Sequence, residues 1–188
     1  MTAAMLVTLA VLHFWEAKPP AQWTDAEVQE LLTNSPWAQS AVDARGAAVA
    51  VYLASARPMR EAELELVRRQ PPVDDPDAQE YGDFLRENQG KQIVLAVALP
   101  DRKALDDPAE VKRIEEECVL KVGGKKYQMT GHFPPSVTDP YLRLVFPRAA
   151  TAADKNLVFE LYVPGVPSPY RRAEFRIQDL TYRGAIEM

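Results

Sequence analysis

The chain has 188 residues, of which 47% are hydrophobic and 26% charged, and its formal net charge is -5. This composition is typical of a folded globular domain and excludes an intrinsically disordered tail. The acidic balance, with no cluster of basic residues on one face, argues against nucleic-acid binding, which needs such a face to displace counterions from phosphates.

The first residues form an apolar segment. Residues 3–14, AAMLVTLAVLHF, are too few to span a bilayer, which takes about 20 residues, but they have the length of a signal-peptide core. No Lys or Arg precedes them, so we interpret the segment as a degenerate or clipped export signal, with a buried helix as the alternative. We expect a leader over residues 1–15, a single α+β domain over residues 16–188 and no stable membrane span. A functional leader implies an extracytoplasmic location, and a leader that does not function implies a cytoplasmic one.

A capping box follows the leader. In residues 24–27, Thr-Asp-Ala-Glu, the first and last side chains have the spacing that satisfies the free backbone N–H groups of a helix start. The helix should begin at Thr24 or Asp25 and stop before Pro36. Trp23 and Trp37 bracket it. Two tryptophans this close could line a ligand groove, and their other interpretation is packing of the helix onto a sheet.

The middle of the chain alternates strands with helices. The apolar run over residues 47–54 predicts a strand, and apolar residues at helical spacing predict a helix over residues 58–69. Asp75 and Pro76 form the start of another helix, which Gly90 follows. The continuous apolar run IVLAVAL over residues 93–99 is typical of a strand covered on both faces, and it is the best candidate for the middle of a sheet.

The second half of the chain is predicted to form mainly strands. A short helix should start at Asp107-Pro108, and a hairpin at Gly123-Gly124 should join strands 114–122 and 125–130. Cys118, the only cysteine, falls on the apolar side of the first of these strands and is interpreted as a buried structural thiol. The fold class is therefore α+β, with short N-terminal helices packed on a mainly antiparallel C-terminal sheet or β-sandwich. Further strands are predicted at 141–146, 156–163, 172–178 and 180–187.

Several of these segments carry a family resemblance. They are FWEAKPPAQWTDAEVQELLTNSPWA, YLASARPMREAELE, IVLAVALPD with DPAEVKR, VFPRAATAADKNLVFE and FRIQDLTYRGAIE. Together they span nearly the whole chain and resemble one uncharacterised family of exported bacterial proteins. The resemblance implies a signal peptide before FWE and a soluble extracytoplasmic domain, and it assigns no activity or catalytic residue. The chain departs from the family pattern in its abbreviated leader.

Motifs for common chemistries are missing from the sequence. It holds no GxSxG, P-loop, GxGxxG or HExxH pattern, and its only histidines are His13 and His132. A catalytic triad would have to use His132. The acids at 115–117 and 74–87 could form a carboxylate pair, but their spacing is not diagnostic, and solvated surface is the other interpretation. We therefore predict no catalytic residue, no metal site and no cofactor.

Two classes of function remain after this search. The first is a non-enzymatic exported module that binds a protein, peptide or glycan partner through aromatic and strand-edge surface. Its alternative is a hydrolase-like enzyme that uses carboxylates or His132. For the binding module, the candidate binding residues are Trp23, Trp37, Tyr141, Tyr162 and Tyr170.

Overall fold

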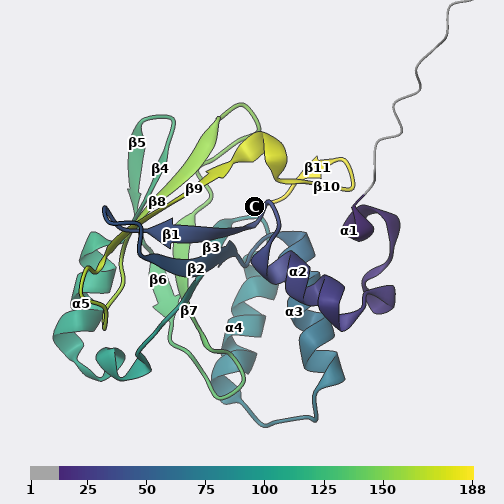
Figure 1. The fold of residues 1–188 in the computed structure, drawn as a ribbon, viewed down its shortest axis with the longest axis horizontal. Helices are drawn as coiled ribbons and strands as arrows, with labels where there is room; N and C mark the ends of the chain where they lie inside the picture. Colours follow the sequence, from purple (N-terminus) through teal and green to yellow (C-terminus); the bar gives the residue numbers. More distant parts are fainter. Residues whose placement is uncertain (1–12) are drawn as a thin grey trace, which may run out of the picture.

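The computed structural model describes residues 13–188 (Figure 1). The predicted leader lies outside this range up to residue 12. Its last residues belong to the folded domain, because Trp15 is 4% exposed and packs in the core with Phe14 against it. Phe14 and Trp15, which the prediction assigns to the leader, thus pack against the domain. Five α-helices are formed by residues 13–188: α1 (Phe14–Ala17), α2 (Asp25–Thr33), α3 (Arg57–Arg69), α4 (Pro76–Glu87) and α5 (Pro108–Glu117).

Most strands of the described chain form one antiparallel sheet of nine strands, in the order β5-β4-β8-β9-β1-β2-β3-β7-β6. A separate hairpin, β10 (Thr181–Tyr182) with β11 (Ala185–Ile186), lies near the end of the chain. Short 3-10 turns are η1 (Pro20–Gln22), η2 (Arg102–Asp106) and η3 (Ile177–Asp179). The nine strands are β1 (Ala38–Val42), β2 (Ala48–Leu53), β3 (Gln92–Ala98), β4 (Val119–Val122), β5 (Lys125–Gln128), β6 (Gly131–Phe133), β7 (Tyr141–Pro147), β8 (Asn156–Tyr162) and β9 (Tyr170–Arg176).

The sheet curls strongly. Its two edge strands, β5 and β6, are separated by only residues 129–130 of the chain, so the two edges must come close together. The rings of Phe146 on β7 and Phe159 on β8 lie 5.3 Å apart, although four strands separate β7 from β8 in the sheet order. The curl encloses an apolar interior to which Leu95, Leu144 and Phe175 also contribute.

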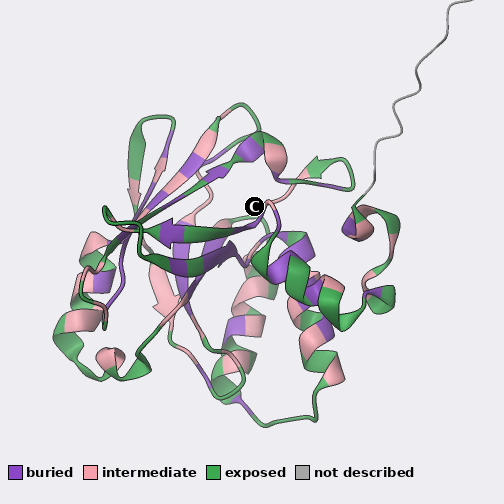
Figure 2. Ribbon diagram, viewed as in Figure 1, coloured by how far each residue is buried: buried purple, intermediate pink, exposed green. Residues whose placement is uncertain are grey.

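Helices α3 and α4 cover the outer face of β2, β3 and β7. Tyr52, Ala96 and Arg143 are neighbours across these three strands and share that face. Arg143 contacts Glu63 on α3 and stacks near Tyr81 on α4, which places both helices over it. Strand β3 is thus buried on both faces, as its continuous apolar sequence predicts (Figure 2).

The structure confirms most of the predicted elements. The antiparallel sheet and the short helices of an α+β fold are present, and α2 begins after Thr24 with both hydrogen bonds of the capping box. Asp75 caps α4 by accepting from the Ala78 N–H. The Gly123-Gly124 hairpin joins β4 and β5. None of the helices within residues 13–188 combines the length and the apolar character that a membrane crossing needs.

Four predicted features are corrected. The strand predicted over residues 114–122 is helix α5 as far as Glu117, because the Asp107 cap and the Arg113–Glu117 ion pair at 3.0 Å support a helix there. Cys118 therefore caps a helix instead of lying on a strand. The strand predicted over residues 180–187 is broken into the β10–β11 hairpin by Arg183 and Gly184, whose φ angles are 48° and 78°. Strand β3 is internal but is not the middle strand, which is β1.

Candidate functional site

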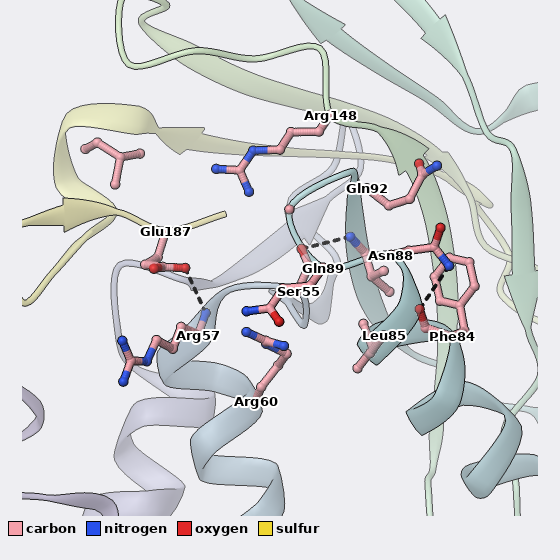
Figure 3. Close-up of a pocket in the computed structure, with 13 residues that line it drawn as sticks. Ser55, Arg57, Arg60, Phe84, Leu85, Asn88, Gln89, Gln92, Arg148 and Glu187 are labelled. Atoms are coloured by element: carbon pink, nitrogen blue, oxygen red, sulfur yellow. Dashed lines mark hydrogen bonds between the residues drawn. The ribbon is translucent and has the colours of Figure 1, made fainter.

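A pocket of about 520 Å³ lies where α3 begins and α4 ends (Figure 3). Segments far apart in the sequence meet there: the residues around Ser55, the end of α4 with its following turn, the start of β3, the residue after β7, and the C-terminal hairpin. Its polar lining residues are Ser55, Arg57, Arg60, Asn88, Gln89, Gln92, Arg148 and Glu187.

The local sequence leaves the start of α3, which lies beside this pocket, without a side-chain cap. The N-cap residue, Ala56, has no side chain that could accept a hydrogen bond, and Pro58 in the first turn has no N–H to satisfy. The Arg57 N–H donates to the Glu187 carboxylate at 3.3 Å. A residue from the end of the chain thus supplies the negative group that the helix start favours.

The turn after α4 forms the opposite wall. Asn88 ends the helix by donating from its side chain to the Phe84 carbonyl at 3.0 Å, and Gly90 follows with a φ of 73°. The chain then enters β3, where the Val94 N–H donates to the Ser55 hydroxyl at 2.9 Å. Because Ser55 Oγ accepts this bond, its own hydrogen can be donated to a ligand.

The three arginines of the pocket differ in their partners. Arg57 forms an ion pair with Glu61 at 2.9 Å, which raises the pKa of Arg57, and its side chain points away from the pocket in Figure 3. Arg148 donates to the Met188 carbonyl at 3.1 Å. Arg60 forms no ion pair or side-chain hydrogen bond with residues 13–188, and its Nε is buried without a partner. Figure 3 shows its guanidinium pointing into the pocket.

Gln92 is the second unsatisfied polar group. Its Oε1 is buried and has no hydrogen-bond partner among the described residues. A buried polar atom that loses its water without gaining a partner costs about 1–3 kcal/mol, so such atoms are uncommon in folded domains. Two of them, one donor on Arg60 and one acceptor on Gln92, line the same pocket. Figure 3 shows that only the Arg60 guanidinium points into the middle of the pocket, whereas the Gln92 amide points away from Arg60.

The pocket also has an apolar wall. Phe84 and Leu85 contribute from α4, Val94 from β3 and Ile186 from the C-terminal hairpin. The Phe84 ring packs against Phe133 with centroids 5.1 Å apart, which fixes this wall to the sheet. Of the residues that line the pocket none is a histidine or a cysteine, and Glu187 is its one carboxylate. The pocket can therefore hold a ligand by charge, hydrogen bonds and apolar contact, but it offers no acid–base pair.

A second polar cluster surrounds Arg143 on β7, and its cation is fully paired. The guanidinium contacts Glu63 at 2.6 Å and Asp139 at 2.7 Å, and it lies 4.9 Å from the Tyr81 ring centroid and 5.3 Å from that of Tyr52. Burial raises the pKa values of both tyrosines, which keeps their hydroxyls neutral. This cluster joins α3 and α4 to the sheet and leaves no charge for a ligand.

The aromatic residues proposed from sequence do not form one surface. Trp23 and Trp37 are 3% and 0% exposed, so both belong to the core. Tyr162 is also inside, at 3%, and only Tyr170, at 57%, is well exposed. The structure brings Tyr162 and Tyr170 together, with ring centroids 5.7 Å apart, whereas Tyr141 pairs separately with Tyr52 at 5.0 Å.

Trp37 has an indirect relation to the pocket. Its Nε1–H donates to the Glu187 carbonyl at 2.8 Å, across 150 positions of sequence. This bond holds the C-terminal segment that carries Glu187 into the pocket wall. The tryptophan thus supports the pocket from the core without lining it.

The residues considered for catalysis lie elsewhere. His132 on β6 faces Glu115 at 3.7 Å, outside the pocket. Cys118 is buried, and burial raises the pKa of its thiol to about 12, so it is not a nucleophile at neutral pH. No group of three or more His, Cys, Asp or Glu side chains within residues 13–188 is arranged to hold a metal ion.

The pocket residues were missed by the sequence analysis. Arg60, Gln92, Arg148 and Glu187 form no motif, since their spacing in the chain is wide and each type is common on surfaces. The one local signal is the position of a charged residue, Arg60, between the apolar Met59 and Ala62 of a predicted helix. That signal alone does not distinguish a ligand contact from a solvated arginine.

Comparisons of the chain with protein-family models, curated proteins and solved structures find no match.

Proposed function

We propose that this protein is a non-enzymatic binding module and that the pocket between α3 and α4 holds an anionic group of its ligand. One observation carries the proposal: Arg60 points its guanidinium into the pocket and has no counter-charge among the described residues. A buried N–H such as that of Arg60 Nε is costly when it has no partner, and a bound carboxylate or phosphate removes that cost through charge-assisted hydrogen bonds.

The surrounding groups support the same assignment. Arg148 adds a second cation on the opposite wall, and the Ser55 hydroxyl can donate. The volume of about 520 Å³ lies within the range of small-ligand sites, which is about 300–1,000 Å³. The pocket thus has the volume of a small-ligand site, positively charged side chains and hydrogen-bonding groups without partners among the described residues.

The hydrolase alternative has less support. A general base must reach the proton that it removes, either directly or through one water. His132 pairs with Glu115, which is largely exposed, and neither residue lines the pocket. The single carboxylate there, Glu187, is bonded to the Arg57 N–H. Export by the N-terminal segment, and the resemblance to exported bacterial proteins, stay predictions from the sequence.

The experiment is an NMR titration of isotopically labelled protein with sodium acetate and with sodium sulfate at constant ionic strength. We expect amide shifts to concentrate at residues 55–60 and 85–92, and to disappear in Arg60→Met. Arg45→Met is the matched control, because Arg45 is an exposed arginine outside the pocket. Shifts that persist in Arg60→Met, or that spread over the whole surface, would contradict the proposal.

A further inference from the structure

We infer that Glu187 limits the charge of the ligand group that the pocket accepts, because it repels a doubly charged group, such as a phosphate monoester, more strongly than a singly charged one, such as a carboxylate. This inference rests on the proposed function, since it concerns the anion of the same pocket. Glu187 is the one carboxylate among the residues that line the pocket, and it is half-buried there. An anion bound at Arg60 therefore shares the pocket with a fixed negative charge.

Three hydrogen bonds hold Glu187 in the pocket wall. Its carboxylate accepts the Arg57 backbone N–H at 3.3 Å, its own N–H donates to the Leu180 carbonyl at 2.8 Å, and its carbonyl accepts the Trp37 Nε1–H at 2.8 Å. The backbone of Glu187 is thus fixed, and its carboxylate can leave the pocket only by giving up the bond to the start of α3. A ligand has to accommodate this charge, because moving it away removes a favourable contact with the helix start.

The charge of Glu187 is not cancelled by a contact. Its carboxylate forms no ion pair with a side chain of residues 13–188, and the Arg57 guanidinium contacts Glu61 instead, at 2.9 Å. The hydrogen bond to Glu61 is the largest cause of the raised pKa of Arg57, and Glu187 raises that pKa further without touching the guanidinium. The charge of Glu187 therefore acts on charged groups that it does not contact.

The size of the pocket brings any bound anion within reach of this charge. A sphere of about 520 Å³ is about 10 Å across, which is close to the Debye length at an ionic strength of about 0.1 M. The Coulomb energy is proportional to the product of the two charges, so a dianion is repelled twice as strongly as a monoanion at the same place. Arg60 attracts the dianion more strongly by the same rule. Glu187 thus limits the preference for double charge that the arginines alone would give.

The test compares sodium methyl sulfate with sodium sulfate by NMR titration of the full chain at constant ionic strength. The two anions share the same sulfur–oxygen group and carry one and two negative charges. Glu187→Gln removes the charge and keeps a side-chain oxygen that can accept from the Arg57 N–H. We expect it to tighten methyl sulfate binding about 3- to 10-fold and sulfate binding by about the square of that factor, because the repulsion doubles with the charge of the ligand.

Two further variants separate the charge of Glu187 from its structural contact. Glu187→Asp keeps the charge and shortens the side chain, so the ratio of the two affinities should stay that of the unchanged protein. Glu30→Gln is the matched control, because Glu30 is an exposed carboxylate outside the pocket, and it should change neither affinity. Amide spectra that match the unchanged protein away from the pocket show that each variant is folded.

The possible results distinguish this inference from the proposed function. If binding depends on Arg60 but Glu187→Gln gives no gain, or equal gains for the two anions, Glu187 only caps α3 and the anion pocket stands. If Arg60→Met leaves the binding of both anions unchanged, or if neither anion binds, the proposed function fails as well. A larger gain for sulfate than for methyl sulfate in Glu187→Gln, absent from Glu187→Asp and Glu30→Gln, supports both.

Discussion

Two regions of the molecule each contain an arginine with at least one buried side-chain nitrogen, and they differ in how that arginine is satisfied. Arg143 is 4% exposed and contacts Glu63 and Asp139 among tyrosine rings. Arg60, on the helix that also carries Glu63, has a buried Nε with no partner among residues 13–188. A charge that is paired within the chain contributes to folding, whereas one that is left unpaired is available to a ligand. The contrast separates the structural cluster from the candidate binding pocket.

The largest effect is expected from breaking the paired region. Arg143→Met should lower the free energy of unfolding by about 3–5 kcal/mol, because it leaves the partly buried carboxylates of Glu63 and Asp139 without their shared cation. Urea denaturation followed by circular dichroism measures the change. Arg172→Met is the control, since Arg172 is exposed and pairs only with Glu174, and it should change stability by less than about 0.5 kcal/mol. Equal effects of the two substitutions would show that the Arg143 cluster does not hold the helices on the sheet.

The same region gives a pH dependence through Asp75, which caps α4. Hydrogen bonds from Thr138 and Ser136 hold the pKa of Asp75 well below its ordinary value. Because its pKa is lower in the folded state, the carboxylate stabilises the fold above the unfolded-state pKa of about 3.9, and this stabilisation is lost as the pH falls below that value. Asp75→Asn should therefore weaken the loss of stability between pH 5 and pH 2, measured by urea denaturation at each pH. An unchanged pH profile would contradict this role.

A smaller effect is expected at the helix cap that the sequence predicts most clearly. Thr24→Ala should lower the free energy of unfolding by about 1 kcal/mol, because the Glu27 N–H loses its acceptor at 3.2 Å. Glu27→Ala should have a smaller effect, through loss of the bond from the Thr24 N–H at 2.8 Å. Thermal unfolding measures both, and two melting temperatures equal to that of the unchanged protein would show that the capping box contributes nothing.

The elements that the sequence predicts correctly are those set by local chemistry. The capping box at Thr24, the Asp75-Pro76 helix start and the Gly123-Gly124 turn depend on residues within a few positions of one another. The error at residues 114–117 has a local cause, since Ile114 and Cys118 fit a helical spacing of four as well as an alternating one. The short strands β1 and β6 were not predicted. β1 pairs with the distant β9 as well as with the neighbouring β2, and β6 has only three residues, too few for an alternating pattern.

The pocket could not be predicted in this way. Arg60 and Gln92 are 32 positions apart, Arg148 follows β7, and Glu187 lies near the end of the chain. Their proximity depends on the curl of the sheet and on the anchoring of the C-terminal segment by Trp37. The proposed aromatic site rested on residue type alone. Residue type does not tell an exposed ring such as Tyr170 from a buried one such as Trp37.

The most direct test of the contrast between the two arginines is the free energy of unfolding of Arg60→Met with and without sodium acetate at constant ionic strength. Without acetate, we expect the variant to equal the unchanged protein in stability or to exceed it by up to about 1–3 kcal/mol, because within residues 13–188 the Arg60 side chain has no partner to lose and the substitution removes a buried donor without a hydrogen bond. With acetate at ten times its dissociation constant, the unchanged protein should gain about 1.4 kcal/mol and the variant nothing. A variant that is less stable by more than about 1 kcal/mol without acetate, and an unchanged protein that gains nothing with it, would show that Arg60 serves the fold and not a ligand.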